Sequence, residues 1–310
     1  MLVAPALLHG QGAIDPSIAP RAAAMARQGQ RTEATDMLGR YLATAPYDAA
    51  AWLALGQLYL EASREWHLRH HDGEPTGGVL LDFASSALDQ SLELPNDSGP
   101  LLRAAVEVDR AVAFLERAGW IRLQAEYAMP EDVMAPGYVV EFGRNLIASC
   151  PIGGVLVTGS DLETTAVWGA ALTDRVRGDL MLVDLSRWND GRYREAVSEA
   201  LGTSDGLSAA AAIGRVSATR PVCLGPGSSL DLSADVVLRA MRLVRVVGPP
   251  APESPENLHV TALVAVDLAR PGAVSSEVVE LYRSAARFNS SLCSGLLRPL
   301  ETRSREACGR

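Results

Sequence analysis

The chain has 310 residues, of which 48% are hydrophobic, and its formal net charge is −9. Its length allows two domains, and its composition is that of folded protein and argues against extensive disorder. The acidic balance, with no run of Lys and Arg, argues against nucleic acid and anionic membrane surfaces as partners. Cys150, Cys223, Cys293 and Cys308 lack the Cys-x2-Cys spacing of zinc and redox motifs, and distant disulfides stay open.

Residues 1–17 form an N-terminal segment with two interpretations. The apolar run Leu2–Leu8 is either the remnant of a secretory signal, which would place the protein outside the cytoplasm, or the tip of a cytoplasmic chain. The compartment therefore stays open. No later stretch reaches the roughly 18 apolar residues that a membrane span requires, so we expect no integral membrane segment.

The first predicted helical pair covers residues 18–28 and 33–43. Gly29 and Gln30 break the chain between the two helices. In the second helix, the small Ala34 and the large Leu38 are predicted to contact the first helix, and Pro46 closes the unit.

The next helix begins at about residue 50 with the pattern Trp-x2-Leu-Gly-x2-Tyr. Its large residues recur at i, i+3 and i+7 and therefore share one helical face. Its glycine leaves room for a partner helix to approach. The four packing positions are Trp52, Leu55, Gly56 and Tyr59.

The partner of this helix is predicted over residues 81–94, after an insertion of about fifteen residues. A further helix is predicted over residues 100–119. A helical hairpin cannot bury its apolar face alone, and about three stacked units make a stable array.

Residues 18–119 resemble a tetratricopeptide-repeat array, because the pattern at residues 52–59 and the spacing of about 34 residues are typical of that family. We assign residues 18–125 to this domain. The resemblance implies stacked helix pairs whose concave face binds an extended peptide or packs on a neighbouring domain. It departs from the family pattern at Ile18 and Met25, where aromatic residues are usual.

Three histidines lie within the predicted insertion. His67, His70 and His71 would share one face if the preceding helix continued, with spacing that suits a divalent metal such as zinc. The alternative is a solvated helix end with basic residues that complement its dipole. We favour the alternative and predict no metal.

Residues 138–247 are predicted to form an α/β domain. Buried strands are expected at residues 153–159, 179–185 and 221–224, because each is a short apolar run. The segments between them have helical patterns, at residues 163–176, 192–201 and 207–218. This alternation predicts a mostly parallel sheet. Residues 236–247 are ambiguous between helix and strand.

The first strand-to-helix turn is the candidate ligand site, because ligands of open α/β sheets lie beyond the carboxyl ends of the strands. The candidate residues are Thr158, Gly159, Ser160, Asp161, Glu163 and Asp184. With Asp179, the acidic residues could gather at one sheet edge around a cation or polar ligand. We favour the other interpretation, in which Asp161 and Glu163 lie at the helix start and Asp179 and Asp184 flank or end a strand. Ser160 or Asp161 could cap the helix.

The turn lacks both the Gly-x-Gly-x-x-Gly fingerprint and a P-loop, so we predict no cofactor. No Ser/His/Asp triad is credible, and we do not predict an enzyme. Residues 144–247 are similar to the soluble C-terminal α/β region of large bacterial membrane proteins related to protein O-mannosyltransferases. The similar segments include residues 151–164, Trp168 and residues 177–186. The resemblance implies the fold but no glycosyl transfer, because the multi-spanning catalytic part has no counterpart in this sequence.

A proline-rich linker, residues 248–255, precedes a helical tail at residues 256–310. The sequence thus predicts a helical repeat domain followed by an α/β domain with a mostly parallel sheet. The predicted function is a protein-interaction or scaffold module. The competing hypothesis is a ligand-binding or enzymatic α/β domain that uses the turn at residues 158–161.

Overall fold

The computed structural model of the protein describes residues 14–69, 76–94, 96–175, 177–232, 236–269, 272–301 and 308. These residues are mostly helical and include one small mixed sheet of five strands. The chain divides into two compact units, residues 1–66 with 74–99 and residues 67–73 with 100–310. The predicted combination of a helical part and an α/β part is confirmed at this level. The predicted N-terminal signal lies outside the described residues.

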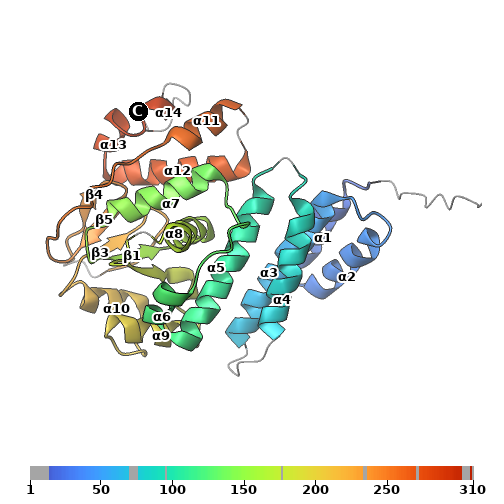
Figure 1. Ribbon diagram of the computed structural model, residues 1–310, viewed down its shortest axis with the longest axis horizontal. Coiled ribbons are helices and arrows are strands. Elements are labelled where there is room, and N and C mark those ends of the chain that lie inside the picture. Colours follow the sequence, from blue (N-terminus) through green and yellow to red (C-terminus); the bar gives the residue numbers. More distant parts are fainter. Residues whose placement is uncertain are drawn as a thin grey trace, which may run out of the picture. The chain divides into compact units, whose positions relative to one another are not determined.

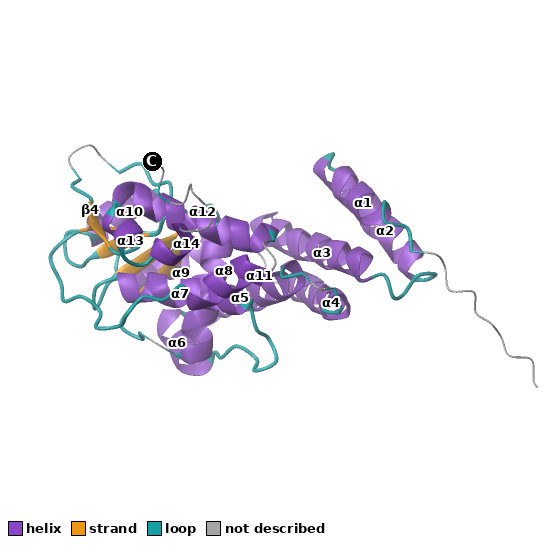
Figure 2. Ribbon diagram, turned by 90° about the horizontal axis from the view of Figure 1, so that it is seen from above, coloured by secondary structure: helices purple, strands orange, loops and turns teal. Residues whose placement is uncertain are grey.

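Two helical pairs form the first unit. Its helices are α1 (Ile18–Arg27), α2 (Arg31–Leu42), α3 (Ala49–Arg69) and α4 (Thr76–Ser91). The helices α1 and α2 pack against each other, and so do α3 and α4 (Figure 1, Figure 2). Gly29 makes the turn between α1 and α2 with a φ of 81°, a left-handed conformation that glycine adopts without a steric penalty.

Three contacts fix the antiparallel register of α3 and α4. A Cβ placed on Gly56 would lie 2.6 Å from Cγ of Leu88, so the two helices touch where the chain has no side chain. The rings of Tyr59 and Phe83 lie 5.4 Å apart. The Ser63 hydroxyl donates to the carbonyl of Gly77 at 2.9 Å. The glycine of the Trp-x2-Leu-Gly-x2-Tyr pattern therefore has the predicted packing role.

The prediction of a fifteen-residue insertion was wrong. The helix α3 continues to Arg69, and α4 covers residues 76–91 rather than 81–94. Residues 64–69 continue the helical pattern without glycine or proline, so nothing in them ends the helix. The extra length of both helices accounts for most of the supposed insertion.

The second unit contains the sheet and the remaining helices. Its strands are β1 (Val155–Thr158), β2 (Met181–Asp184), β3 (Val222–Leu224), β4 (Arg239–Met241) and β5 (Val244–Val247). Its longer helices are α5 (Ser98–Ala118), α6 (Trp120–Glu126), α7 (Gly137–Ser149), α8 (Asp161–Asp174), α9 (Gly191–Leu201), α10 (Ala209–Val216), α11 (Thr261–Ala269) and α12 (Ala273–Phe288). Short helical turns are η1 (Leu185–Arg187), α13 (Ser291–Ser294) and α14 (Arg298–Glu301).

The sheet has the order β2-β1-β3-β5-β4. The interior strand β1 pairs in parallel with both neighbours, so Val157 lies opposite Val183 of β2 and Leu224 of β3. The prediction of a mostly parallel sheet was wrong for the other half, because β5 pairs antiparallel with both β3 and β4. The ambiguous residues 236–247 contain this hairpin, whose turn places Arg242 at a φ of 48°.

Helices cover both faces of the sheet. Figure 1 shows α7 and α12 on one side of the strands and α9 and α10 on the other. The helices α7 and α8 approach closely at Gly143, where an added Cβ would lie 2.0 Å from the Ala166 carbonyl oxygen. One apolar core joins the sheet to α5 and to the C-terminal helices. The predicted tail at residues 256–310 therefore packs within the α/β unit.

The division into two units places α5 with the sheet. This helix, interpreted from the sequence as part of a third repeat unit at residues 100–119, groups with the α/β unit. Its buried residues belong to the core of that unit: Ala104, Val108, Ala111, Val112 and Leu115. The first unit thus contains four helices among the described residues, not a third pair.

Candidate functional sites

The predicted ligand-binding turn lies between β1 and α8 and is closed by hydrogen bonds within the chain. The Glu163 carboxylate accepts the N–H of Gly159 at 2.7 Å and the N–H of Gly227 at 3.2 Å. Ser160 caps α8, as predicted, and its hydroxyl accepts the N–H of Glu163 at 3.2 Å. The Thr158 hydroxyl bonds to that of Thr164 at 2.7 Å. A carboxylate of the chain therefore takes the backbone donors that would bind an anionic ligand.

The loop after β3 seals this turn. A Cβ on Gly159 would lie 2.4 Å from the Gly227 carbonyl oxygen, and one on Gly225 would lie 2.1 Å from a Glu163 carboxylate oxygen. Both positions thus need glycine for the close approach. Glu163 is fully buried, and its burial raises its pKa to about 7, although the two N–H donors act in the opposite direction.

Asp184, at the end of β2, belongs to a second buried cluster. Its carboxylate accepts the N–H and the hydroxyl of Ser186 and pairs with Arg187 at 3.1 Å. Arg187 also pairs with Asp109 of α5. The backbone N–H of Asp184 donates to the hydroxyl of Tyr193 at 2.7 Å. Burial raises the pKa of Asp184, and the Arg187 guanidinium opposes this shift.

The four acidic residues do not gather at one sheet edge, because Asp179 precedes β2 and Asp184 ends it. Asp161 is exposed at the start of α8, on the same side as Glu163 and Asp184. Asp179 precedes β2 and lies at the opposite sheet edge, where it pairs with Arg177 at 2.8 Å and accepts the N–H of Gly153 at 2.7 Å. The reason is that Asp179 lies at the amino end of a strand and Asp184 at its carboxyl end. No three His, Cys, Asp or Glu residues in the described part of the chain are placed to hold a metal ion.

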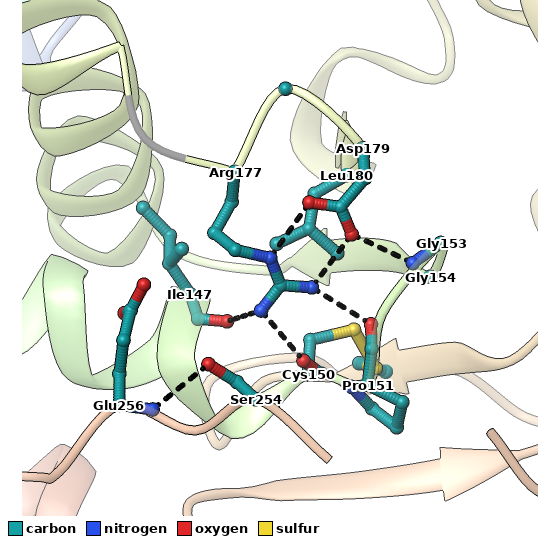
Figure 3. Close-up of polar contacts among 12 residues, drawn as sticks. Ile147, Cys150, Pro151, Gly153, Gly154, Arg177, Asp179, Leu180, Ser254 and Glu256 are labelled. Atoms are coloured by element: carbon teal, nitrogen blue, oxygen red, sulfur yellow. Dashed lines mark hydrogen bonds and ion pairs between the residues drawn. A yellow bond between two sulfur atoms is a disulfide. The ribbon is translucent and has the colours of Figure 1, made fainter. Parts of the chain in front are cut away.

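Arg177 makes several hydrogen bonds at the sheet edge where Asp179 lies (Figure 3). Its guanidinium donates to the carbonyl oxygens of Ile147, Cys150 and Pro151 and to both carboxylate oxygens of Asp179. The same edge holds the disulfide between Cys150 and Cys223. All of the donors of Arg177 serve the fold, so this arginine is structural.

The predicted packing residues of the helical unit share one core. Ala34 and Leu38 are fully buried, and Leu55 is 5% exposed. Trp52 and Tyr59 are partly buried against the same cluster. The Trp52 indole N–H donates to the carbonyl of Pro46 at 2.8 Å, which ties α3 to the turn before it.

A groove lies on this helical unit, lined by α1, α2 and α3. It holds about 760 Å³ of empty space, part of which is open to solvent. Its apolar lining consists of small or buried side chains, namely Ala23, Ala26, Ala54 and Leu58. Its polar lining consists of Arg27, Arg31, Gln57 and Glu61.

The polar groups of the groove differ in how they are engaged. Arg31 pairs with Glu61 at 3.7 Å and also with Glu65. The Gln57 amide donates to Glu61 at 3.0 Å. Arg27 is exposed and makes no ion pair with any described residue. Among the described residues that line the groove, Arg27 is therefore a cation without an ion-pair partner, and it lies beside alanine side chains.

Of the three histidines in the predicted insertion, the structure describes only His67. His67 lies in the last turn of α3, and burial lowers its pKa, which fits a neutral structural side chain. His70 and His71 lie outside the described residues. Within the described ranges, no helix has the length and apolar character to cross a membrane.

No protein-family model, curated protein or solved structure matches this chain. The two family resemblances therefore rest on the quoted sequence patterns alone.

The sequence did not identify the residues that line the groove or the closure of the turn. In the sequence, groove residues such as Ala23 and Ala54 look like ordinary helix formers. They line one groove only because α1 and α3 lie close together in the fold. One available signal was Gly225-Pro226-Gly227, because two glycines so close to a strand end often mark a close backbone approach.

Proposed function

We propose that the protein binds an extended peptide segment of a partner protein in the groove lined by α1, α2 and α3. The observation that carries this proposal is the combination of an alanine-lined groove with an unpaired Arg27 at its side. An extended backbone can approach closely where side chains are small, and an acidic residue of the peptide would meet Arg27.

The resemblance to tetratricopeptide repeats supports the same location. In a stacked array, the large residues of each pair face inward and leave the first helices of successive pairs to form a binding face. Here α1 and α3 are those first helices, and both line the groove. The inward positions Leu38, Leu55 and Gly56 are occupied by packing contacts.

The competing site, the turn at residues 158–161, has less in its favour. Its backbone donors at Gly159 and Gly227 already bond to Glu163. A ligand there would have to displace a buried carboxylate. We therefore place the interaction in the helical unit.

The test is a selection of peptides from a displayed random library on the purified full chain, followed by affinity measurements. Arg27→Glu and Gln57→Trp are expected to weaken the selected peptides by about tenfold or more, because they reverse the charge and fill the groove. Both side chains are exposed, so the fold should tolerate them. Asp161→Ala is the matched control and should bind normally. Binding that is lost in Asp161→Ala but kept in both groove variants would contradict the proposal.

A further inference from the structure

A separate pocket lies within the α/β unit, beside α6 and α8, and the proposed function does not use it. Its cavity has a volume of about 70 Å³. Its wall is largely apolar and includes Trp120, Leu123, Ile147, Leu172 and Leu182.

One face of α8 forms a side of this pocket. Trp168, Ala171, Leu172 and Arg175 all line it. They recur at i, i+3, i+4 and i+7, the spacing of residues on one face of a helix and the residue that follows it. An aromatic ring, two aliphatic side chains and a guanidinium are therefore aligned along one wall.

Trp168 contributes a buried donor without a partner. Its side chain is fully buried, and its indole N–H has no hydrogen-bond partner among the described residues. A buried indole N–H usually has such a partner. The ring packs edge to face on Trp120, with centroids 6.1 Å apart. This wall of the pocket thus holds a donor that the fold itself does not use.

Arg175 combines a charge that the fold does not use with a backbone conformation that is unfavourable for a non-glycine residue. Three non-glycine residues among those described have positive φ, namely Arg175 at 49°, Arg177 at 54° and Arg242 at 48°. Arg177 and Arg242 each donate to three or more groups of the fold: the former as in Figure 3, the latter to the carbonyls of Ala148, Ser254 and Glu256.

No such contacts account for the positive φ of Arg175. It is exposed, and its guanidinium makes no hydrogen bond or ion pair with the described residues. It occupies the left-handed C-cap of α8, a position where glycine is the usual residue. No hydrogen bond or ion pair of its side chain with the described residues compensates for this conformation.

We propose that this pocket binds a small aliphatic carboxylate, whose charged group pairs with Arg175 and whose tail enters the apolar space. Arg175 and the Trp168 indole, which have no partner among the described residues, are donors, and no Asp or Glu lines the pocket, so an acceptor is the complementary ligand. One free guanidinium matches one negative charge. The cavity volume of about 70 Å³ suits a short tail of about three carbon atoms.

The experiment compares butyrate with 1-butanol by isothermal titration calorimetry on the full chain. The wild type is expected to bind butyrate about tenfold more tightly than 1-butanol, because only butyrate pairs with Arg175. In Arg175→Asn the butyrate affinity should fall to that of 1-butanol, while the affinity for 1-butanol stays unchanged. Asparagine tolerates the left-handed conformation, so this variant should fold.

A second variant tests the place of the tail. Ala171→Phe fills the pocket and is expected to abolish binding of both probes, and its thermal unfolding transition serves as the check on folding. The proposal would be overturned if butyrate did not bind at millimolar concentration. It would also be overturned if either variant, once shown to fold, bound butyrate as the wild type does.

Discussion

Glu163 shows how a single residue changes the meaning of a sequence motif. A strand-to-helix turn with Thr-Gly-Ser-Asp suits an external anion, yet the carboxylate two residues further on bonds to the backbone donors of Gly159 and Gly227. The side chain thus acts as an internal ligand that joins two loops. The residue types of the site were predicted from the sequence, but their internal use was not, because Gly227 is distant along the chain.

This residue predicts a specific pH dependence of stability. Burial raises the pKa of Glu163 from 4.5 to about 7, so the folded state holds its proton more tightly than the unfolded state does. The contribution of this group to stability is complete below pH 4.5 and is lost as the pH rises through about 7. The size of the loss is about 3 kcal/mol.

The measurement is the free energy of unfolding in urea, from pH 4.5 to pH 8, for the wild type and Glu163→Gln. We expect the wild-type value minus the variant value to fall by about 3 kcal/mol over this range, since glutamine does not titrate. Equal slopes for the two proteins would show that Glu163 does not hold a raised pKa.

At the scale of elements, the close approach of α3 and α4 is the feature most open to test. An added methyl group at Gly56 would meet Leu88 at 2.6 Å and the Ala84 carbonyl oxygen at 3.3 Å. We expect Gly56→Ala to lower the free energy of unfolding by roughly 1 to 3 kcal/mol, because a packed interface resists added volume.

Gly39 provides the matched control within α2. It is exposed and has no heavy atom within 4 Å of an added Cβ, so Gly39→Ala should gain roughly 0.5 to 1 kcal/mol from helix propensity alone. Chemical denaturation of both variants separates the two effects. A Gly56→Ala protein as stable as the wild type would contradict the packing role of this glycine.

The same scale shows why some elements were predicted from the sequence and others were missed. The strand β1 was predicted because it belongs to a short apolar run that is bounded by glycines. The helix α7 was not predicted, because it starts directly after Pro136 and is buried along most of its length. Its only charged side chains, Glu141 and Arg144, give it a narrow polar face, which weakens the helical pattern of the sequence.

At the scale of the whole molecule, the cysteines were informative only in three dimensions. All four are paired, as Cys150–Cys223 and Cys293–Cys308. Four cysteines allow three pairings, and no sequence pattern selects one. The first pair joins the end of α7 to β3 across 73 residues, and such a link stabilises a fold by roughly 4 kcal/mol. Disulfides of this kind persist where thiols are oxidised, which favours the extracytoplasmic interpretation of the sequence.

The central claim is that the chain binds an extended peptide through its helical unit. Amide hydrogen exchange of the full chain, with and without a selected peptide, tests this claim most directly because it reports every segment at once. The claim predicts slower exchange in α1 and α3, around Ala26 and Gln57, and no change at residues 158–163. Slower exchange at residues 158–163 with none in α1 and α3 would contradict it.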